Sequence, residues 1–407
     1  MEVLHPRCAG LDVHSQTIVA AIRIAEGGKV RREAETFGTT TGELLRLRDW
    51  LKEFGVTHVG MEATGVYWKP VWHILEDGFT QVLGNPREIQ NVPGRKTDVN
   101  DATWLSDLIA HGLIRSSFVP PRPIQELRDL TRTRKQMMRE RGQHVQRIQK
   151  VLEDANVKLT NALSDLTGVS GRAILEAMVR GVSDPDQLAA LAHARVRASK
   201  EQLRDALQGR VTDHHRFMLQ IHLRQIDSID AAIELLEAQI ERALAPFREQ
   251  VGHLLGMPGI SEVMAATIVA EIGTDMSAFP TAGHLLAWAG LSPQQNESAG
   301  KRRNSRTKKQ RWLKTAMVQA AWAASRKRDS YYHAQFLRIR ARRGAKKAVV
   351  AVAASMLTAV YHMFKNNTAY NELGHEYFQQ RDTGRAADRL VKRLRSMGYE
   401  VELRRAA

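Results

Sequence analysis

Four acidic residues stand where a carboxylate is poorly placed unless it has a partner. Asp12 interrupts the apolar pattern of "AGLDVHS", and Glu62 ends the apolar run "HVGMEAT". Both runs predict strands, and acidic residues are depleted from strands. Asp98 and Asp101 lie three residues apart at the start of a helical segment, so they share one helix face and their charges repel. A cation bound between these carboxylates would relieve that repulsion.

Together the four carboxylates predict a site for Mg²⁺ or Mn²⁺, because both ions prefer oxygen ligands. Two such ions about 4 Å apart can clamp the attacking and leaving oxygens of a phosphodiester displacement. Taken singly, Asp98 is explained as a helix cap and Asp101 as a solvent-facing charge. The combination with two strand carboxylates favours the metal site. Arg95 and Lys96, directly before the pair, are either phosphate-binding residues or solvated loop charges.

The elements that must position these residues are predicted within residues 1–118. Alternating apolar and polar residues over 8–37 indicate strands, with "EGG" as a turn between the second and third. A helix, a strand, a helix, a strand and a final helix follow. Three meandering strands and then alternating units are typical of a mixed sheet covered by helices. In a ribonuclease-H-like sheet of this kind the first and fourth strands are neighbours, so their carboxylates would meet.

The middle of the chain, residues 119–247, predicts a helical arm after the Pro-rich break "VPPRPIQ". Its second long helix repeats apolar residues every seven positions, which is typical of a coiled coil. These residues are Leu219, Ile226, Ile233 and Ile240. The seam fits an antiparallel hairpin and a dimerisation element equally well. A smaller helical insert is expected near 171–210.

Residues 248–375 predict a mainly helical C-terminal domain. "LLGMPGISEVMAATIVAEIG", residues 254–273, fits a helix-hairpin-helix that offers backbone N–H groups to a phosphate, or a plain helical turn. A Gly- and Ser-containing loop follows, and then eight Lys or Arg without an acid between 301 and 314. Such an unmixed basic run favours a phosphate-facing surface. The tail, 376–407, predicts one helix and a strand.

Composition limits the class of protein. The 407 residues suit two or three domains, and 43% hydrophobic residues allow a sizeable core. A formal net charge of +16 points to nucleic acid as the partner. The single cysteine, Cys8, excludes an intrachain disulfide and fits a reducing bacterial cytoplasm. The uncharged run 348–364 indicates a buried helix and no membrane segment.

The acidic set and the later loop together resemble a known family. Asp12, Glu62 and the "DVNDA" pair are similar to the Asp-Glu-Asp-Asp set of RuvC-like transposases. "GLSPQQNESAGKRRNSRTKK" resembles the C-terminal transposase domain of the same proteins. The combination resembles the DEDD transposases of bridge-RNA-guided insertion sequences, which are related to the Piv DNA invertases. The resemblance implies a RuvC-like sheet domain, a helical coiled-coil arm and a mainly helical transposase domain.

The resemblance also implies a nucleophilic serine, and Ser298 in "NESAGK" matches that position. Ser298 would attack a DNA phosphodiester and form a 5′-phosphoserine link, while the carboxylate-bound metal stabilises the leaving oxygen. The nearby basic residues would contact nucleic acid. They are Lys301, Arg302, Arg303, Arg306, Lys308 and Lys309.

The implied partners are the ends of the mobile element, target DNA and a structured noncoding guide RNA. Family members join the sheet domain of one subunit to the serine domain of another, so a homodimer is expected, becoming a tetramer in the synaptic complex. Three other interpretations stay open. They are a metal-dependent junction-resolving endonuclease without a serine nucleophile, a DNA invertase, and a non-enzymatic nucleic-acid-binding scaffold.

Overall fold

The structure is a computed structural model, and it describes residues 2–89, 98–293, 296–298, 301–303, 312–378 and 383–402. Within these ranges, a few segments are described by their backbone only. They are 87–88, 98–100, 296–298, 301–303, 383–386 and 388–389. The chain divides into two compact units, Met1–Val119 and Pro120–Ala407. The division falls within the Pro-rich stretch of the sequence, and each unit is taken by itself below.

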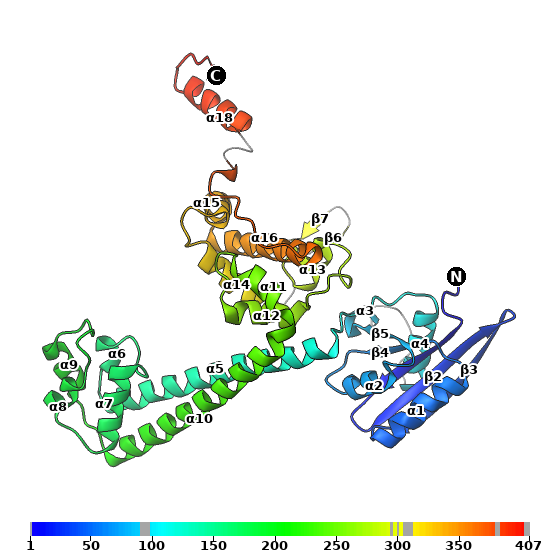
Figure 1. The fold of residues 1–407 in the computed structure, drawn as a ribbon, viewed down its shortest axis with the longest axis horizontal. Coiled ribbons are helices and arrows are strands. Elements are labelled where there is room, and N and C mark those ends of the chain that lie inside the picture. Colours follow the sequence, from blue (N-terminus) through cyan, green and yellow to red (C-terminus); the bar gives the residue numbers. More distant parts are fainter. Residues whose placement is uncertain are drawn as a thin grey trace. The chain divides into compact units, whose positions relative to one another are not determined.

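The first unit is built on a five-stranded mixed sheet (Figure 1). In chain order its strands are β1 (Arg7–Val13), β2 (Thr17–Glu26), β3 (Lys29–Gly38), β4 (His58–Glu62) and β5 (Thr80–Gly84). Their order across the sheet is β3-β2-β1-β4-β5. The β1–β2 and β2–β3 pairs are antiparallel, whereas β1–β4 and β4–β5 are parallel. The predicted order of elements and the adjacency of the first and fourth strands are therefore confirmed.

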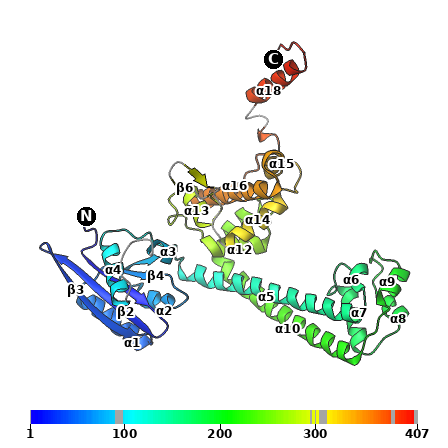
Figure 2. The same cartoon turned by 180° about the vertical axis from the view of Figure 1, so that it is seen from behind.

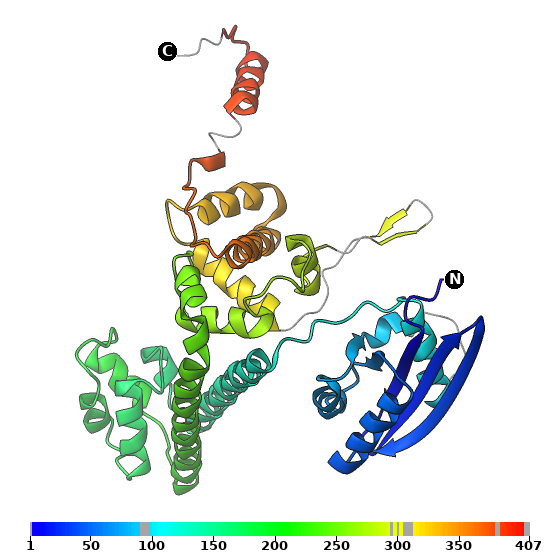
Figure 3. The same cartoon turned by 45° about the vertical axis from the view of Figure 1, so that its right-hand side comes forward.

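One face of the sheet carries the main core of the first unit. Helices α1 (Thr41–Glu53) and α2 (Trp68–Leu75) bury their apolar residues there. The strands contribute alternate residues, such as Leu11 and Met61, which are both fully buried. Figure 3 shows α1 beside the long ribbon of β2 and β3. Because side chains alternate along a strand, the residues on either side of Leu11 and Met61 point to the opposite face.

The opposite face is covered by α4 (Asp98–Ala110), which follows the short α3 (Pro86–Ile89). Two glycines allow this helix to lie directly on the strands. A Cβ atom built on Gly10 would overlap the backbone carbonyl oxygen of Ala102. A Cβ atom on Gly60 would lie 2.5 Å from Cγ1 of Ile109. Glycine at these two strand positions is thus required by the close approach of α4.

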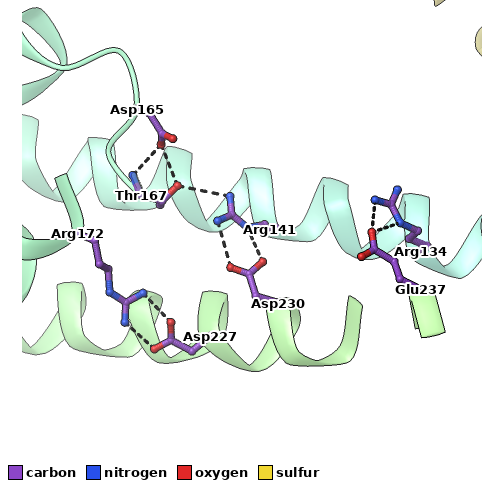
Figure 4. A network of polar contacts seen from close by, with 8 residues as sticks. All are labelled: Arg134, Arg141, Asp165, Thr167, Arg172, Asp227, Asp230 and Glu237. Carbon is purple, nitrogen blue, oxygen red and sulfur yellow. Dashed lines mark hydrogen bonds and ion pairs between the residues drawn. The ribbon is translucent and has the colours of Figure 1, made fainter. Parts of the chain in front are cut away.

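The second unit begins with two long helices, α5 (Arg122–Asp154) and α10 (Asp213–Leu244), which lie side by side (Figure 2). Arg134 pairs with Glu237, and Arg141 pairs with Asp230, so the two helices run antiparallel (Figure 4). The four heptad residues of α10 are buried, none more than 7% exposed. They are therefore used within one chain, as the hairpin interpretation requires.

A smaller helical cluster joins the far ends of α5 and α10. It consists of α6 (Leu159–Ala162), α7 (Val169–Val179), α8 (Pro185–Ala190) and α9 (Lys200–Leu207). These helices share one apolar core with Ile148 and Leu152 of α5 and Leu219 of α10. The expected insert near 171–210 corresponds to α7 through α9.

Five further α-helices of the second unit form one packed group with α16 (Ala345–Asn366). They are α11 (Arg248–Leu255), α12 (Glu262–Ile272), α13 (Ala282–Trp288), α14 (Trp312–Ala324) and α15 (Tyr331–Arg343), with a single 3₁₀ turn, η1 (Ala245–Phe247), before them. In the described ranges, α16 is the one helix long and apolar enough to cross a membrane, but 56% of that window is buried. It is the core helix of this part of the chain, as the sequence predicted.

The tail differs from its prediction. Its helix, α18 (Thr383–Ser396), is present, but residues 397–402 form no strand. The expected strand rested on the alternating "YEVEL". Such a segment gains strand hydrogen bonds only beside a second strand, and the described part of the tail offers none.

Candidate active site

Asp12 and Glu62 come together through the register of two parallel strands. The last β1–β4 partners are Leu11 and Met61, so Asp12 and Glu62 follow at the same level at the carboxyl ends of their strands. Since Leu11 and Met61 are buried in the core on one face, the two carboxylates belong to the face covered by α4. Both side chains are half-buried.

The start of α4 is directed toward the same strand ends. The thiol of Cys8 lies 3.3 Å from the carbonyl oxygen of Ser106, whereas Gly10 approaches Ala102. Moving along β1 toward Asp12 therefore moves back along α4 toward its first turn. That turn begins at Asp98 and includes Asp101, whose side chain is exposed. The fold thus brings the backbone positions of all four predicted carboxylates to one edge of the sheet.

Two polar residues contact the strand carboxylates. The imidazole Nε2 of His14 lies 3.2 Å from Oδ2 of Asp12. The hydroxyl of Thr64 donates a hydrogen bond of 2.9 Å to Oε1 of Glu62. Neither contact was predicted, although each residue stands two positions after its carboxylate. Such contacts fix the orientation of a metal-ligating carboxylate.

The donor set has the chemistry of a site for hard divalent cations. Carboxylate oxygens at a half-exposed edge suit Mg²⁺ or Mn²⁺. No group of three or more His, Cys, Asp or Glu side chains is close enough to bind a metal among those that the structure describes. The side chain of Asp98 is outside that set. Arg95 and Lys96 also lie outside the described residues.

Ser298 lies in a short antiparallel hairpin, not in the plain loop that the sequence suggested. Strand β6 (Asn296–Ser298) pairs with β7 (Lys301–Arg303), and Ser298 is opposite Lys301. Only Ala299 and Gly300 separate the strands, and a two-residue connection containing Gly is typical of a tight hairpin. The backbone places Ser298 at the end of β6 and Arg302 beside Glu297.

The predicted nucleic-acid contacts of the basic run cannot be compared with side-chain positions. The side chains of Lys301, Arg302 and Arg303 are not described, and Arg306, Lys308 and Lys309 lie outside the described residues.

The turn between α11 and α12 is packed against another helix. Gly259 has a φ of +81°, and a Cβ atom there would lie 2.6 Å from the backbone nitrogen of Ala324 in α14. Met257 and Ile260 on either side are buried. Packing on α14 therefore explains this glycine without a phosphate. Ser261 caps α12, because its hydroxyl accepts a hydrogen bond from the backbone N–H of Met264.

Two family models match the chain. A DEDD transposase model of the IS110 type, described as "Transposase", matches residues 9–157. A second model, described as "Transposase IS116/IS110/IS902 family", matches residues 252–337. The two stretches together take up more than half of the chain. The first contains all four carboxylates, and the second contains Ser298 and the basic run.

Two individual proteins are similar to parts of the chain. A curated protein of Streptomyces coelicolor, "Insertion element IS110 uncharacterized 43.6 kDa protein", is 31% identical over 140 residues. The match covers 33% of this chain and 33% of that protein, so the chain spans about a third of the length of this relative. Among solved structures, "Thermus thermophilus RuvC structure" is 14% identical, with 27% of this chain and 99% of that chain covered. The TM-score is 0.22, and we draw no inference from it.

Proposed function

Because the chain belongs to the IS110 family of DEDD transposases, we propose that it cleaves and rejoins DNA strands as the recombinase of an insertion sequence. The observation that carries this proposal is the parallel register of β1 and β4, which sets Asp12 beside Glu62 at the edge toward which α4 begins. Carboxylates that bind one metal site must come together from separate elements, whereas an acidic residue with a structural role can stand alone.

We assign metal binding to Asp12, Glu62, Asp98 and Asp101. Bound Mg²⁺ or Mn²⁺ would supply charge stabilisation for the attacking and leaving oxygens of a phosphodiester. His14 and Thr64 hold the two strand carboxylates in place through the contacts described above. The half-exposed setting of these carboxylates supports the proposal, because a long polyanionic substrate must reach them.

We further propose Ser298 as the nucleophile. Its hydroxyl oxygen forms a bond to phosphorus while the bond from phosphorus to the 3′ oxygen breaks. The 3′ oxygen leaves and takes up a proton, and the 5′ phosphate stays on the serine. Lys301, opposite Ser298 in the hairpin, and the basic residues that follow supply positive charge near this phosphate.

The partners and the assembly are part of the same proposal. DNA would be read with the help of a structured noncoding RNA, and a homodimer or tetramer would join carboxylates and serine from different subunits. We propose 1–118 as the catalytic domain, 119–247 as a coiled-coil arm, 248–375 as the serine domain with a helix-hairpin-helix-like element, and 376–407 as a tail. The net charge of +16 supports a polyanionic partner. We place the action in the bacterial cytoplasm, at the nucleoid.

A covalent protein–DNA adduct would test this function directly. The protein would be expressed with its flanking DNA, denatured and digested, and peptides carrying a nucleotide would be sought by mass spectrometry. We expect an adduct on the peptide containing Ser298, and none in Ser298→Ala or Asp12→Ala. Ser292→Ala, which changes a nearby serine, should keep the adduct.

The other outcomes select competing functions. DNA cleavage that persists in Ser298→Ala, with no adduct, would support a metal-dependent junction-resolving endonuclease. Absence of any Asp12-dependent cleavage would support a non-enzymatic nucleic-acid-binding scaffold. An adduct confined to one fixed chromosomal segment would identify a DNA invertase.

A further inference from the structure

Three cations of α5 gather around one aromatic ring in the second unit. The guanidinium carbon of Arg132 lies 5.2 Å from the ring centroid of Trp312, the first residue of α14. The ammonium of Lys135 and the guanidinium of Arg139 each lie 5.6 Å from the same centroid. The ring is half-buried, and Arg139 is exposed. We call Arg132, Lys135, Arg139 and Trp312 the Trp312 cluster.

The charges of this cluster are only partly balanced. Arg132 donates two hydrogen bonds, of 2.8 and 2.9 Å, to the two carboxylate oxygens of Glu271, which is 1% exposed. Arg128, one turn earlier, is directed to the backbone carbonyls of Ala270 and Glu271 at the end of α12. Glu271 is therefore occupied by Arg132. Within the described part of the chain, Lys135 and Arg139 form no ion pair with a carboxylate.

Two neighbouring cations of α5 differ from Lys135 and Arg139 in having carboxylate partners. Arg134 and Arg141 turn toward α10 and pair with Glu237 and Asp230 (Figure 4). Lys135 and Arg139 stand four residues apart on the face toward α14, where like charges repel. Burial lowers the pKa of Lys135, and the charge of Arg139 lowers it further. The carboxylate of Glu271, already paired with Arg132, offsets these effects only in part.

We propose that Lys135 and Arg139, held at the ring of Trp312, bind a phosphate of a nucleic-acid backbone. This inference rests on the proposed function only in taking nucleic acid as the partner. A phosphate oxygen would accept hydrogen bonds from both cations and remove the repulsion between them. Trp312 follows Lys309 by three residues, so the site continues the basic stretch that follows Ser298.

The salt dependence of binding tests the site. The Lys135→Gln/Arg139→Gln protein would be compared with Arg147→Gln/Lys150→Gln, which removes the same charge from exposed positions of α5. Fluorescence anisotropy with a labelled DNA duplex would be measured over about 50 to 200 mM KCl. Loss of one phosphate contact lowers the slope of log Kd against log salt by about 1 and weakens binding about eightfold near 0.1 M salt. The control should keep the wild-type slope.

Thermal unfolding and the salt slope together separate a binding site from internal packing. If the cluster only joins α5 to α14, removing two cation–π contacts lowers the Tm of the double variant and leaves its salt slope at the wild-type value. If it is a phosphate site, the salt slope falls whatever the change in Tm.

An unchanged slope in the Lys135/Arg139 variant, or an equal change in both variants, would overturn the inference while leaving the proposed recombinase intact. The adduct at Ser298 is scored separately, so the two can fail independently. Repeating the titration with an RNA duplex identifies the source of the phosphate. A slope change with DNA alone assigns the site to DNA, and a change with both assigns it to either backbone.

Discussion

At the scale of single residues, the candidate active site depends on how its carboxylates are held. Asp12 and Glu62 end neighbouring strands, where the backbone is fixed but the side chains can still rotate. The hydroxyl of Thr64 limits this rotation for Glu62 by donating to Oε1. Thr64 should therefore be a positioning residue for the proposed reaction, acting only through Glu62.

Replacement of Thr64 tests that role. Thr64→Val keeps the shape of the side chain but removes the donor, and we expect metal affinity and DNA cleavage to fall about tenfold. Thr64→Ser keeps the hydroxyl and should retain most of both. Mn²⁺ titration followed by isothermal calorimetry would measure affinity apart from activity. Equal values for Thr64→Val and the wild type would show that Glu62 needs no such support.

At the scale of elements, the decisive contact is between α4 and the sheet. The helix can bring its first turn to the strand ends only because Gly10 and Gly60 leave room for its backbone. At Gly10 the neighbouring atoms are the backbone of Ala102 and Ser106, which cannot move aside as a flexible side chain would. The position of the helical carboxylates thus depends on a residue that has no chemistry of its own.

We expect Gly10→Ala to destabilise the first unit by about 1–3 kcal/mol through overpacking, and to reduce metal binding as well. Gly142→Ala is the matched control, since Gly142 lies inside α5 with nothing within 4 Å of an added Cβ. There the substitution should stabilise the helix by about 1 kcal/mol. Chemical denaturation of both variants measures these differences. A stable Gly10→Ala protein would mean that α4 does not lie on β1 as described.

Much of this arrangement was predictable from the sequence. Alternating apolar residues gave the strands, and the order of elements gave the adjacency of β1 and β4, hence of Asp12 and Glu62. The role of Gly10 was not predictable, because a glycine in a strand does not identify the helix that approaches it. The Trp312 cluster was missed for a similar reason. Basic residues at helical spacing are usually solvated, and only the tertiary contact with Trp312 separates Lys135 and Arg139 from Arg134 and Arg141.

The hairpin at Ser298 was also missed. Three-residue strands carry too few residues for an alternating pattern, so the segment resembles a loop until its partner strand is known. The roles of the four carboxylates, of Ser298 and of the basic run all stay predictions.

At the scale of the whole molecule, the chain consists of two compact units with separate cores. Units of this kind can unfold separately, and a single cysteine allows the unfolding of the first unit to be followed by itself. Cys8 is its single cysteine and lies in the first unit, fully buried between β1 and α4. Burial raises the pKa of its thiol to about 11.

Cys8 should therefore resist alkylation until the first unit opens. Two effects act together, since the thiol is inaccessible and, near pH 8, only about one in a thousand molecules would carry the reactive thiolate. We expect iodoacetamide labelling in increasing urea to follow the unfolding of the first unit, whereas circular dichroism, dominated by the helices of the second unit, follows the rest. Two separated midpoints would demonstrate independent units, and a single shared midpoint would show that they unfold as one. Gly10→Ala should shift the labelling midpoint to lower urea and leave the helical transition in place, because only the first unit contains the α4 contact.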